Sequence, residues 1–183
     1  SHTSEQTDKW MWMFRRAPGF FDVVAYTGNG TAGRTVTHNL GVVPEMMIVQ
    51  ARDFSGGRPP PVYHTGMGNT KFMYLTSNAA EATNTWWNNT TPTASVFTVG
   101  SNSVVNLAST NYVAQLFASL DGISKVGSYT GNGTSQTIDC GFSAGARFVL
   151  IKRTDNSGNW KVMDTERGIV AGDDKVLELD NSS

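Results

Sequence analysis

The strongest candidate for a binding site in the sequence is the run Trp86-Trp87-Asn88-Asn89. Adjacent residues on an extended strand point to opposite faces, so one of the two indoles can face the core while the other faces solvent. An exposed indole beside two amides could stack on a sugar ring or anchor a protein partner. The alternative is structural: one indole fills the core, and the other packs under the loop of residues 77–94 or between subunits.

Tyr63, His64 and Trp160 form a second candidate, because they occupy corresponding regions of an internal repeat, each after a loop that carries arginine and aspartate. They could line a surface groove, or they could be ordinary cross-strand packing residues. His38 and His64 have no second histidine, cysteine or carboxylate at a metal-ligand spacing. We therefore expect neither a metal site nor a cofactor.

Carboxylates are the remaining candidates for chemistry, since glycoside hydrolysis needs two of them facing one bond. The acids expected in loops are Asp53, Asp155, Asp164 and Glu166. Asp53 and Asp155 recur close to an arginine, which fits a loop-bracing ion pair or an Asx turn. The sequence also has no Gly-x-Ser-x-Gly elbow, no phosphate-binding loop and no Cys–His pairing. These patterns favour a protein that is not an enzyme.

The elements that must position these residues are organised by a phrase, Tyr-Thr-Gly-Asn-Gly-Thr, that occurs at residues 26–31 and again at 129–134. Asn-Gly between two β-type runs is a strong hairpin signal, because both residues tolerate the positive φ of primed turns. We therefore predict two hairpins, with residues 20–27 and 34–40 as the arms of the first.

The repeat extends beyond this phrase. With small shifts, the aligned segments are 46–49 with 148–151, 62–65 with 162–165, 71–75 with 175–179, and 10–14 with 113–117. Repeats of this size indicate tandem domains rather than solenoid units, whose periods are about 20–50 residues. Nothing in the second copy matches residues 81–110. We expect that the chain was cut from a longer polypeptide, the alternative being a self-contained, degenerate duplication.

Composition supports a β-rich fold. Only 16% of the residues are charged, while 19 glycines and many Thr, Asn and Ser residues favour strands and turns over helices. Further strands are expected at 10–14, 45–52, 62–65, 71–76, 95–100, 104–107, 111–120, 123–129, 136–141, 147–153, 159–164 and 175–179. The sequence predicts an all-β protein with two related antiparallel β-sandwich units of jelly-roll type in tandem and essentially no helix. We place a polar tail at 1–9, the first unit at 10–110 and the second, incomplete unit at 111–183.

Charge and hydropathy exclude several classes of partner. The net charge of −1 provides no basic surface for nucleic acid or for an anionic membrane. No apolar run approaches the roughly 20 residues that span a bilayer, and the polar start lacks the apolar core of a signal peptide. The single cysteine, Cys140, cannot form an internal disulfide, and we expect it to be a small buried residue.

Several long phrases resemble an uncharacterised β-domain of virion proteins from tailed phages, including marine and cyanobacterial phages. They span residues 19–30, 38–49, 87–100, 112–118 and 127–155. The second copy departs from the pattern: it lacks the closing aromatic strand, and residues 143–146 (Ser-Ala-Gly-Ala) stand where the family usually has a proline.

The resemblance implies a non-enzymatic structural protein of the virion, a tail fibre or appendage module for host attachment and virion assembly. It implies self-association, as a homotrimer by analogy with fibres, contacts with other virion proteins, and host-surface glycan as a further partner. The apolar segment 10–14 also favours association, because its faces need cover from another strand or subunit. Two alternatives stay open: a capsid-decoration or tail-knob protein without receptor binding, and the carbohydrate-binding part of a depolymerase.

Overall fold

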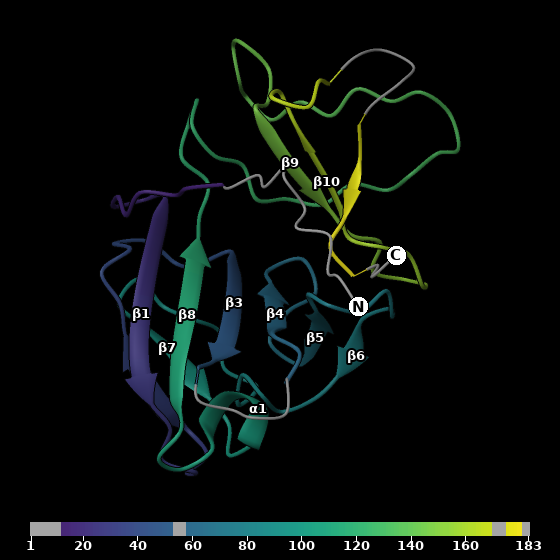
Figure 1. Cartoon of the computed structure of the whole chain (residues 1–183). Helices are drawn as coiled ribbons and strands as arrows, with labels where there is room; N and C mark the ends of the chain where they lie inside the picture. Colours follow the sequence, from purple (N-terminus) through teal and green to yellow (C-terminus); the bar gives the residue numbers. More distant parts are fainter. Residues whose placement is uncertain (1–11, 53–57, 170–174, 181–183) are drawn as a thin grey trace, which may run out of the picture.

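The computed structural model in Figure 1 describes residues 12–52, 58–169 and 175–180. The chain is an all-β protein: eleven strands form antiparallel sheets in these ranges, and the one helix, α1 (Ser103–Asn106), is a single turn. We call β1 to β8, with α1, the first unit, and the residues after β8, with β9 to β11, the second unit. The predicted fold class is confirmed at this level.

The first unit is built on a six-stranded sheet with the order β1-β8-β3-β4-β5-β6 (Figure 1). The bounds are β1 (Phe21–Thr27), β8 (Asn111–Phe117), β3 (Met46–Ala51), β4 (Pro61–His64), β5 (Lys71–Tyr74) and β6 (Ala82–Thr83). Side chains alternate across this sheet, because successive residues of a strand point to opposite faces. Tyr112, Ala114 and Leu116 of β8 are fully buried on one face, together with Met47 and Val49 of β3.

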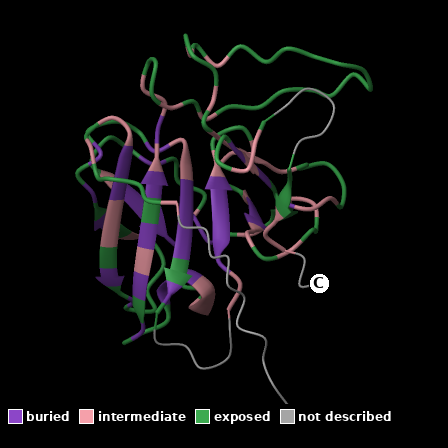
Figure 2. Ribbon diagram, turned by 45° about the horizontal axis from the view of Figure 1, so that its top comes forward, coloured by how far each residue is buried: buried purple, intermediate pink, exposed green. Residues whose placement is uncertain are grey.

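That face is covered by a two-stranded sheet of β2 (Arg34–Thr37) and β7 (Val96–Val99). Val36, Phe97 and Val99 from these strands join the same core cluster, so the first unit is a β-sandwich. Figure 2 shows the burial of the central strands against the exposed connecting loops.

The second unit is a three-stranded sheet with the order β11-β10-β9. Its strands are β9 (Phe148–Ile151), β10 (Lys161–Asp164) and β11 (Leu177–Glu178). It packs against the other face of the six-stranded sheet, where Ile48, Val62 and Met73 meet Trp160, Leu150 and Leu179. β3 is therefore covered on both faces from Met47 to Val49, as its apolar sequence predicts, whereas Gln50 is exposed.

The β3-β4-β5 and β9-β10-β11 meanders share one register. Met46 pairs with His64 in the first unit, and Phe148 pairs with Asp164 at the aligned positions of the second. The outer pairs correspond as well, since Pro61 pairs with Tyr74 and Lys161 with Glu178. The alignment of 46–49, 62–65 and 71–75 with the second copy thus agrees with the strand pairing.

The predicted hairpins are wrong. β1 pairs with β8 and β2 pairs with β7, so the first Tyr-Thr-Gly-Asn-Gly-Thr phrase connects the two layers of the sandwich. The loop is held by Asn106, whose side-chain Nδ2 donates to Asn29 Oδ1, Thr31 O and Gly100 O. The strand expected at 104–107 is instead α1, which Asn102 caps by accepting a hydrogen bond from the Val104 amide.

The strands expected at 123–129 and 136–141 are also absent: both segments are irregular and largely exposed. Their counterparts β1 and β2 pair with β8 and β7, and no described segment after β11 corresponds to those partners. In the described residues the second unit is consequently one sheet rather than a sandwich. Cys140, within the second segment, is half-buried rather than buried.

The predicted second unit begins at residue 111, whereas in the structure β8 (Asn111–Phe117) pairs with β1 and β3 in the first unit's sheet. The segment 10–14 is only partly described: residues 12–14 are not in a strand, and residues 10 and 11 lie outside the described ranges. The polar tail 1–9 and Asp53 lie outside them too.

Candidate functional site

The aromatic residues singled out in the sequence are buried rather than displayed. Trp86 is 3% exposed, Trp87 1% and Tyr63 2%, all within the core of the first unit. Trp87 donates its indole N–H to the Lys71 carbonyl at 3.0 Å and meets Tyr63 edge to face. Both indoles point into one core because this segment is not an extended strand: Asn88 follows at φ 52° in a turn.

The remaining candidates are dispersed. Asn88 is half-buried and Asn89 is exposed, also with positive φ (48°), so both serve the turn. Trp160, 3% exposed, lies between the two units and donates its indole N–H to the Tyr74 carbonyl at 2.8 Å. The structure therefore shows the packing alternative for Trp160 as for the other rings. Contact of these residues with a glycan or a partner protein stays a prediction.

His64 lies half-buried at the end of β4, where its Nδ1 accepts a hydrogen bond from the Gly66 amide at 3.0 Å. Burial lowers the pKa of His64. His38 has a similar arrangement, because its Nδ1 faces the Leu40 amide and burial lowers its pKa as well. Both rings are thus hydrogen-bonded residues of the first unit, and their burial disfavours the charged form.

Two of the candidate carboxylates, Asp155 and Asp164, are paired with arginines. Asp155 accepts hydrogen bonds from Arg153 at 2.7 and 3.2 Å, as the bracing interpretation predicts. Asp164 pairs with Arg167 at 2.8 Å. Among the described residues, no group of three or more His, Cys, Asp or Glu side chains is placed to bind a metal ion. No helix in the described ranges has the length and hydropathy needed to span a membrane.

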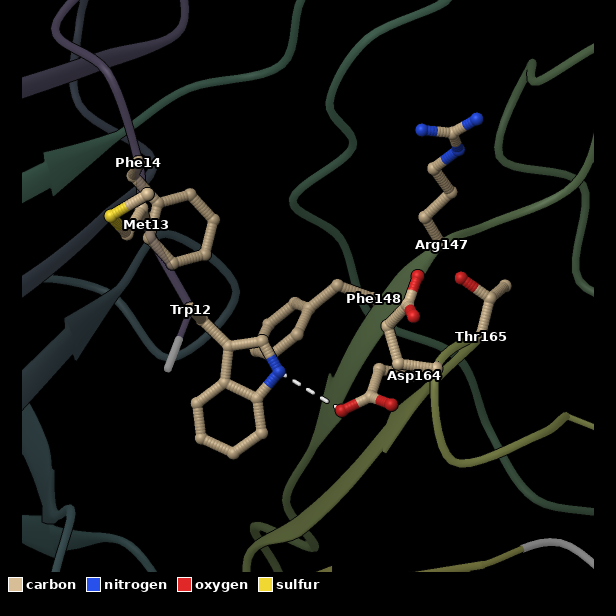
Figure 3. A pocket seen from close by; sticks show the side chains of 8 residues that line it. Trp12, Met13, Phe14, Arg147, Phe148, Asp164 and Thr165 are labelled. Carbon is tan, nitrogen blue, oxygen red and sulfur yellow. Dashed lines mark hydrogen bonds between the residues drawn. The ribbon is translucent and has the colours of Figure 1, made fainter. Parts of the chain in front are cut away.

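A hollow of about 270 Å³ lies where the N-terminal segment meets the second unit (Figure 3). It is lined by Trp12, Met13, Phe14, Arg147, Phe148, Asp164, Thr165 and Glu166. We call this the N-terminal contact site. It brings together a segment from the beginning of the chain, the start of β9 and the end of β10.

Aromatic rings form one side of this site. Phe14 lies 5.6 Å from Phe21 and 5.7 Å from Phe117 between ring centroids, and both of these belong to the first unit. The same ring meets Phe148 of β9 edge to face at 5.7 Å, and Trp12 also meets Phe148 at 5.7 Å. Phe14 therefore joins the two units through aromatic contacts.

A buried carboxylate forms the other side. Asp164, 4% exposed, accepts a hydrogen bond from the Trp12 indole N–H at 3.0 Å. It also accepts from the Arg167 amide and guanidinium, whose carbon lies 5.2 Å from the Trp12 ring centroid. These hydrogen bonds, led by that of the Arg167 amide, lower the pKa of Asp164. A carboxylate held charged in this way is suited to anchoring an indole rather than to donating a proton.

In the sequence, Trp12 lies in an apolar segment and Asp164 among the candidate acids, and nothing there brings the two together. Neither Phe148 nor Arg167 was predicted as a site residue. The internal alignment is the signal that could have indicated the contact of Phe14 with Phe148. It places Phe14 on Phe117 and Phe148 on Met46, and Phe117 pairs with Met46 in the first unit. Arg167 left no such signal, because its contact arises in the turn after β10.

The fold and this site define an all-β protein of two packed units joined at an aromatic contact. Residues 16–183 match the family described as a domain of unknown function (DUF7483), and the chain belongs to that family. A search of curated proteins found no significant match, and neither did a search of solved structures.

Proposed function

We propose that this chain is a non-enzymatic structural protein of a tailed-phage virion, a fibre or appendage module whose surfaces serve assembly. The observation that carries the proposal is the burial of Trp86, Trp87, Tyr63 and Trp160, since the rings best suited to stacking on a sugar are used for packing. Large apolar side chains are exposed instead around the N-terminal segment and the second unit, as at Met13, Ile123 and Tyr129. Such exposure is typical of surfaces that meet a protein partner.

The carboxylates support a role without catalysis. Asp155 and Asp164, two of the acids that could have served a depolymerase, are each paired with an arginine. A depolymerase that used these two acids as general acid and general base would need one of them to be free to exchange a proton. The proposal therefore favours assembly over the carbohydrate-cleaving alternative.

Purified virions of a phage that encodes the chain provide the test. We expect peptides from both units in the particle by mass spectrometry, and gold-labelled antibody against the chain on the tail or its fibres in electron micrographs. Detection in infected cells with absence from purified particles would contradict the proposal.

A glycan array on the purified chain separates assembly from host attachment. We expect no specific glycan signal. A signal that Asn89→Gly removes would instead favour attachment through the exposed turn, because Asn89 is exposed and glycine tolerates its positive φ of 48°.

A further inference from the structure

The second unit has an open sheet edge. β9 ends the sheet order β11-β10-β9, so within the described ranges no strand pairs with its outer side. Its counterpart β3 lies between β4 and β8, and Met47 and Val49 of β3 are fully buried. All four residues of β9 are only half-buried. An apolar strand edge of this kind is a template for an added strand.

The segment that aligns with β8 lies next to this edge. Phe14 aligns with Phe117, which pairs with Met46 in the first unit. Phe14 contacts Phe148, the residue aligned with Met46. Phe14 is thus at the start of β9, where the last residue of a β8 counterpart would pair.

Within one chain, however, the segment does not extend the sheet. In β8 register Trp12 would lie opposite Leu150, because the aligned residues Gln115 and Ile48 pair in the first unit. Trp12 instead turns onto Phe148 and Asp164. Residues 12–14 form no strand, Met13 is 84% exposed and Phe14 is 40% exposed.

The connection to β1 explains this bend. Ala17 forms a β-bridge with Phe21, and Arg16 pairs with Asp22 at 2.6 Å. These contacts fix the segment to the first unit a few residues after Phe14. A segment that enters from a second copy is tethered to that copy's first unit and not to the one packed against this β9, so it can follow β9 along its length.

We propose that the open edge of β9 accepts residues 12–16 of a second copy of this chain as an antiparallel strand, with Phe14 opposite Phe148 and Trp12 opposite Leu150. Each copy carries both the donor segment and the acceptor edge, and these are different surfaces. Association is therefore head-to-tail, and it gives a ring if the rotation closes and a filament if it does not. The inference depends on the sheet geometry alone and holds whether or not the chain is a virion protein.

Disulfide trapping tests the register. In a Cys140→Ser background, Trp12→Cys and Leu150→Cys are combined, since paired residues on adjacent strands have Cα atoms about 4.5–5.5 Å apart, within the range a disulfide spans. After oxidation we expect dimers and a ladder of larger species on a non-reducing gel, which a reductant removes. A cross-link confined to the monomer band would show that the chain pairs with its own segment, and would overturn the proposal.

Sedimentation of the unmodified chain gives an independent reading that does not remove Trp12. We expect the average mass to rise with concentration, and Phe14→Ser to weaken association at least tenfold. Leu107→Ser is the matched control, because Leu107 is an apolar residue of similar exposure (37%) beside Gly28, at the end of β1 opposite the contacts of Phe14 with Phe21 and Phe117, and it should leave association unchanged. A chain that stays monomeric at all concentrations, or equal effects of the two variants, would overturn the proposal.

Discussion

The same six residues behave differently in the two units. In the first unit, Tyr26 is 8% exposed, stacks on Tyr112 and donates its hydroxyl to the Val105 carbonyl at 2.7 Å. In the second unit, the identical position, Tyr129, is 52% exposed. The local sequence is the same, so the difference comes from what packs on it.

The partner in the first unit is the segment around α1. Asn106, fully buried, donates to Asn29 Oδ1, while the Asn132 carboxamide oxygen in the second unit accepts only from its neighbour Thr134. A side chain on Gly28 would place its Cβ 2.0 Å from the Leu107 carbonyl oxygen, whereas one on Gly131 would meet nothing within 4 Å. A β-type sequence thus becomes a strand only when a strand is available to pair with it.

Replacing the two tyrosines should show the largest contrast. Tyr26→Ala removes a buried ring and is expected to lower the free energy of unfolding by about 3–5 kcal/mol. Tyr129→Ala changes an exposed ring and should stay within about 0.5 kcal/mol. Urea unfolding followed by tryptophan fluorescence measures both. Tyr26→Phe, which loses only the hydroxyl group, should cost about 1 kcal/mol; equal losses at the two positions would remove the contrast.

Gly28 and Gly131, which occupy aligned positions, test the same difference between the two units without removing a side chain. Gly28→Ala forces the backbone away from Leu107 and should cost about 1–3 kcal/mol, as other overpacked substitutions do. Gly131→Ala adds a methyl group in open space and is expected to leave the unfolding midpoint unchanged. If Gly28→Ala were as stable as the parent, the close approach of the Leu107 segment would not be a constraint.

Acidification should produce the smallest contrast, and it should affect the first unit first. His64 and Asp164 occupy aligned positions, and each has a lowered pKa. An unfolded histidine binds a proton below about pH 6.5, before the buried ring does, so stability contributed by His64 and His38 is lost as pH falls through that value. The contribution of Asp164 is present above about pH 4, near the ordinary carboxyl pKa, and is lost only below it.

Thermal unfolding between pH 7 and pH 5 measures this effect. We expect the melting temperature to fall in the parent and to fall less in a His38→Gln/His64→Gln variant. Asp164→Asn should leave the change of melting temperature with pH over this range as it is in the parent. A slope that the histidine replacements do not alter would assign the pH dependence to other groups.

Much of the fold was predictable from local patterns. The apolar run 45–52 predicted β3, and the strand expected at 111–120 is β8, because the order of apolar residues indicates which faces of a strand are buried. Pairing was not predictable in the same way. The Asn-Gly hairpin rule looks only at neighbouring runs, whereas Asn106, which holds the first loop, lies 77 residues away from Asn29.

The candidate site also depends on contacts between residues that are far apart in the sequence. Trp86 and Trp87 form the strongest binding candidate in the sequence, but both lie in a turn over residues 86–89 and both rings enter the core, where a strand would have separated them. Trp12, Phe148 and Asp164 meet only through tertiary contact. No spacing in the sequence marks that contact, apart from the alignment of segment 10–14 with β8.

The most direct test gives the second unit, within one molecule, the partner strands that the first unit has in β7 and β8. Residues 76–118, which carry β7, α1 and β8, are grafted after Leu179, the position aligned with Leu75, and amide hydrogen exchange is measured across 123–141. We predict that 123–129 and 136–141 become protected as strands in the graft while they exchange rapidly in the parent chain. Rapid exchange in both proteins would contradict the claim that the second unit is the same fold without its partner strands.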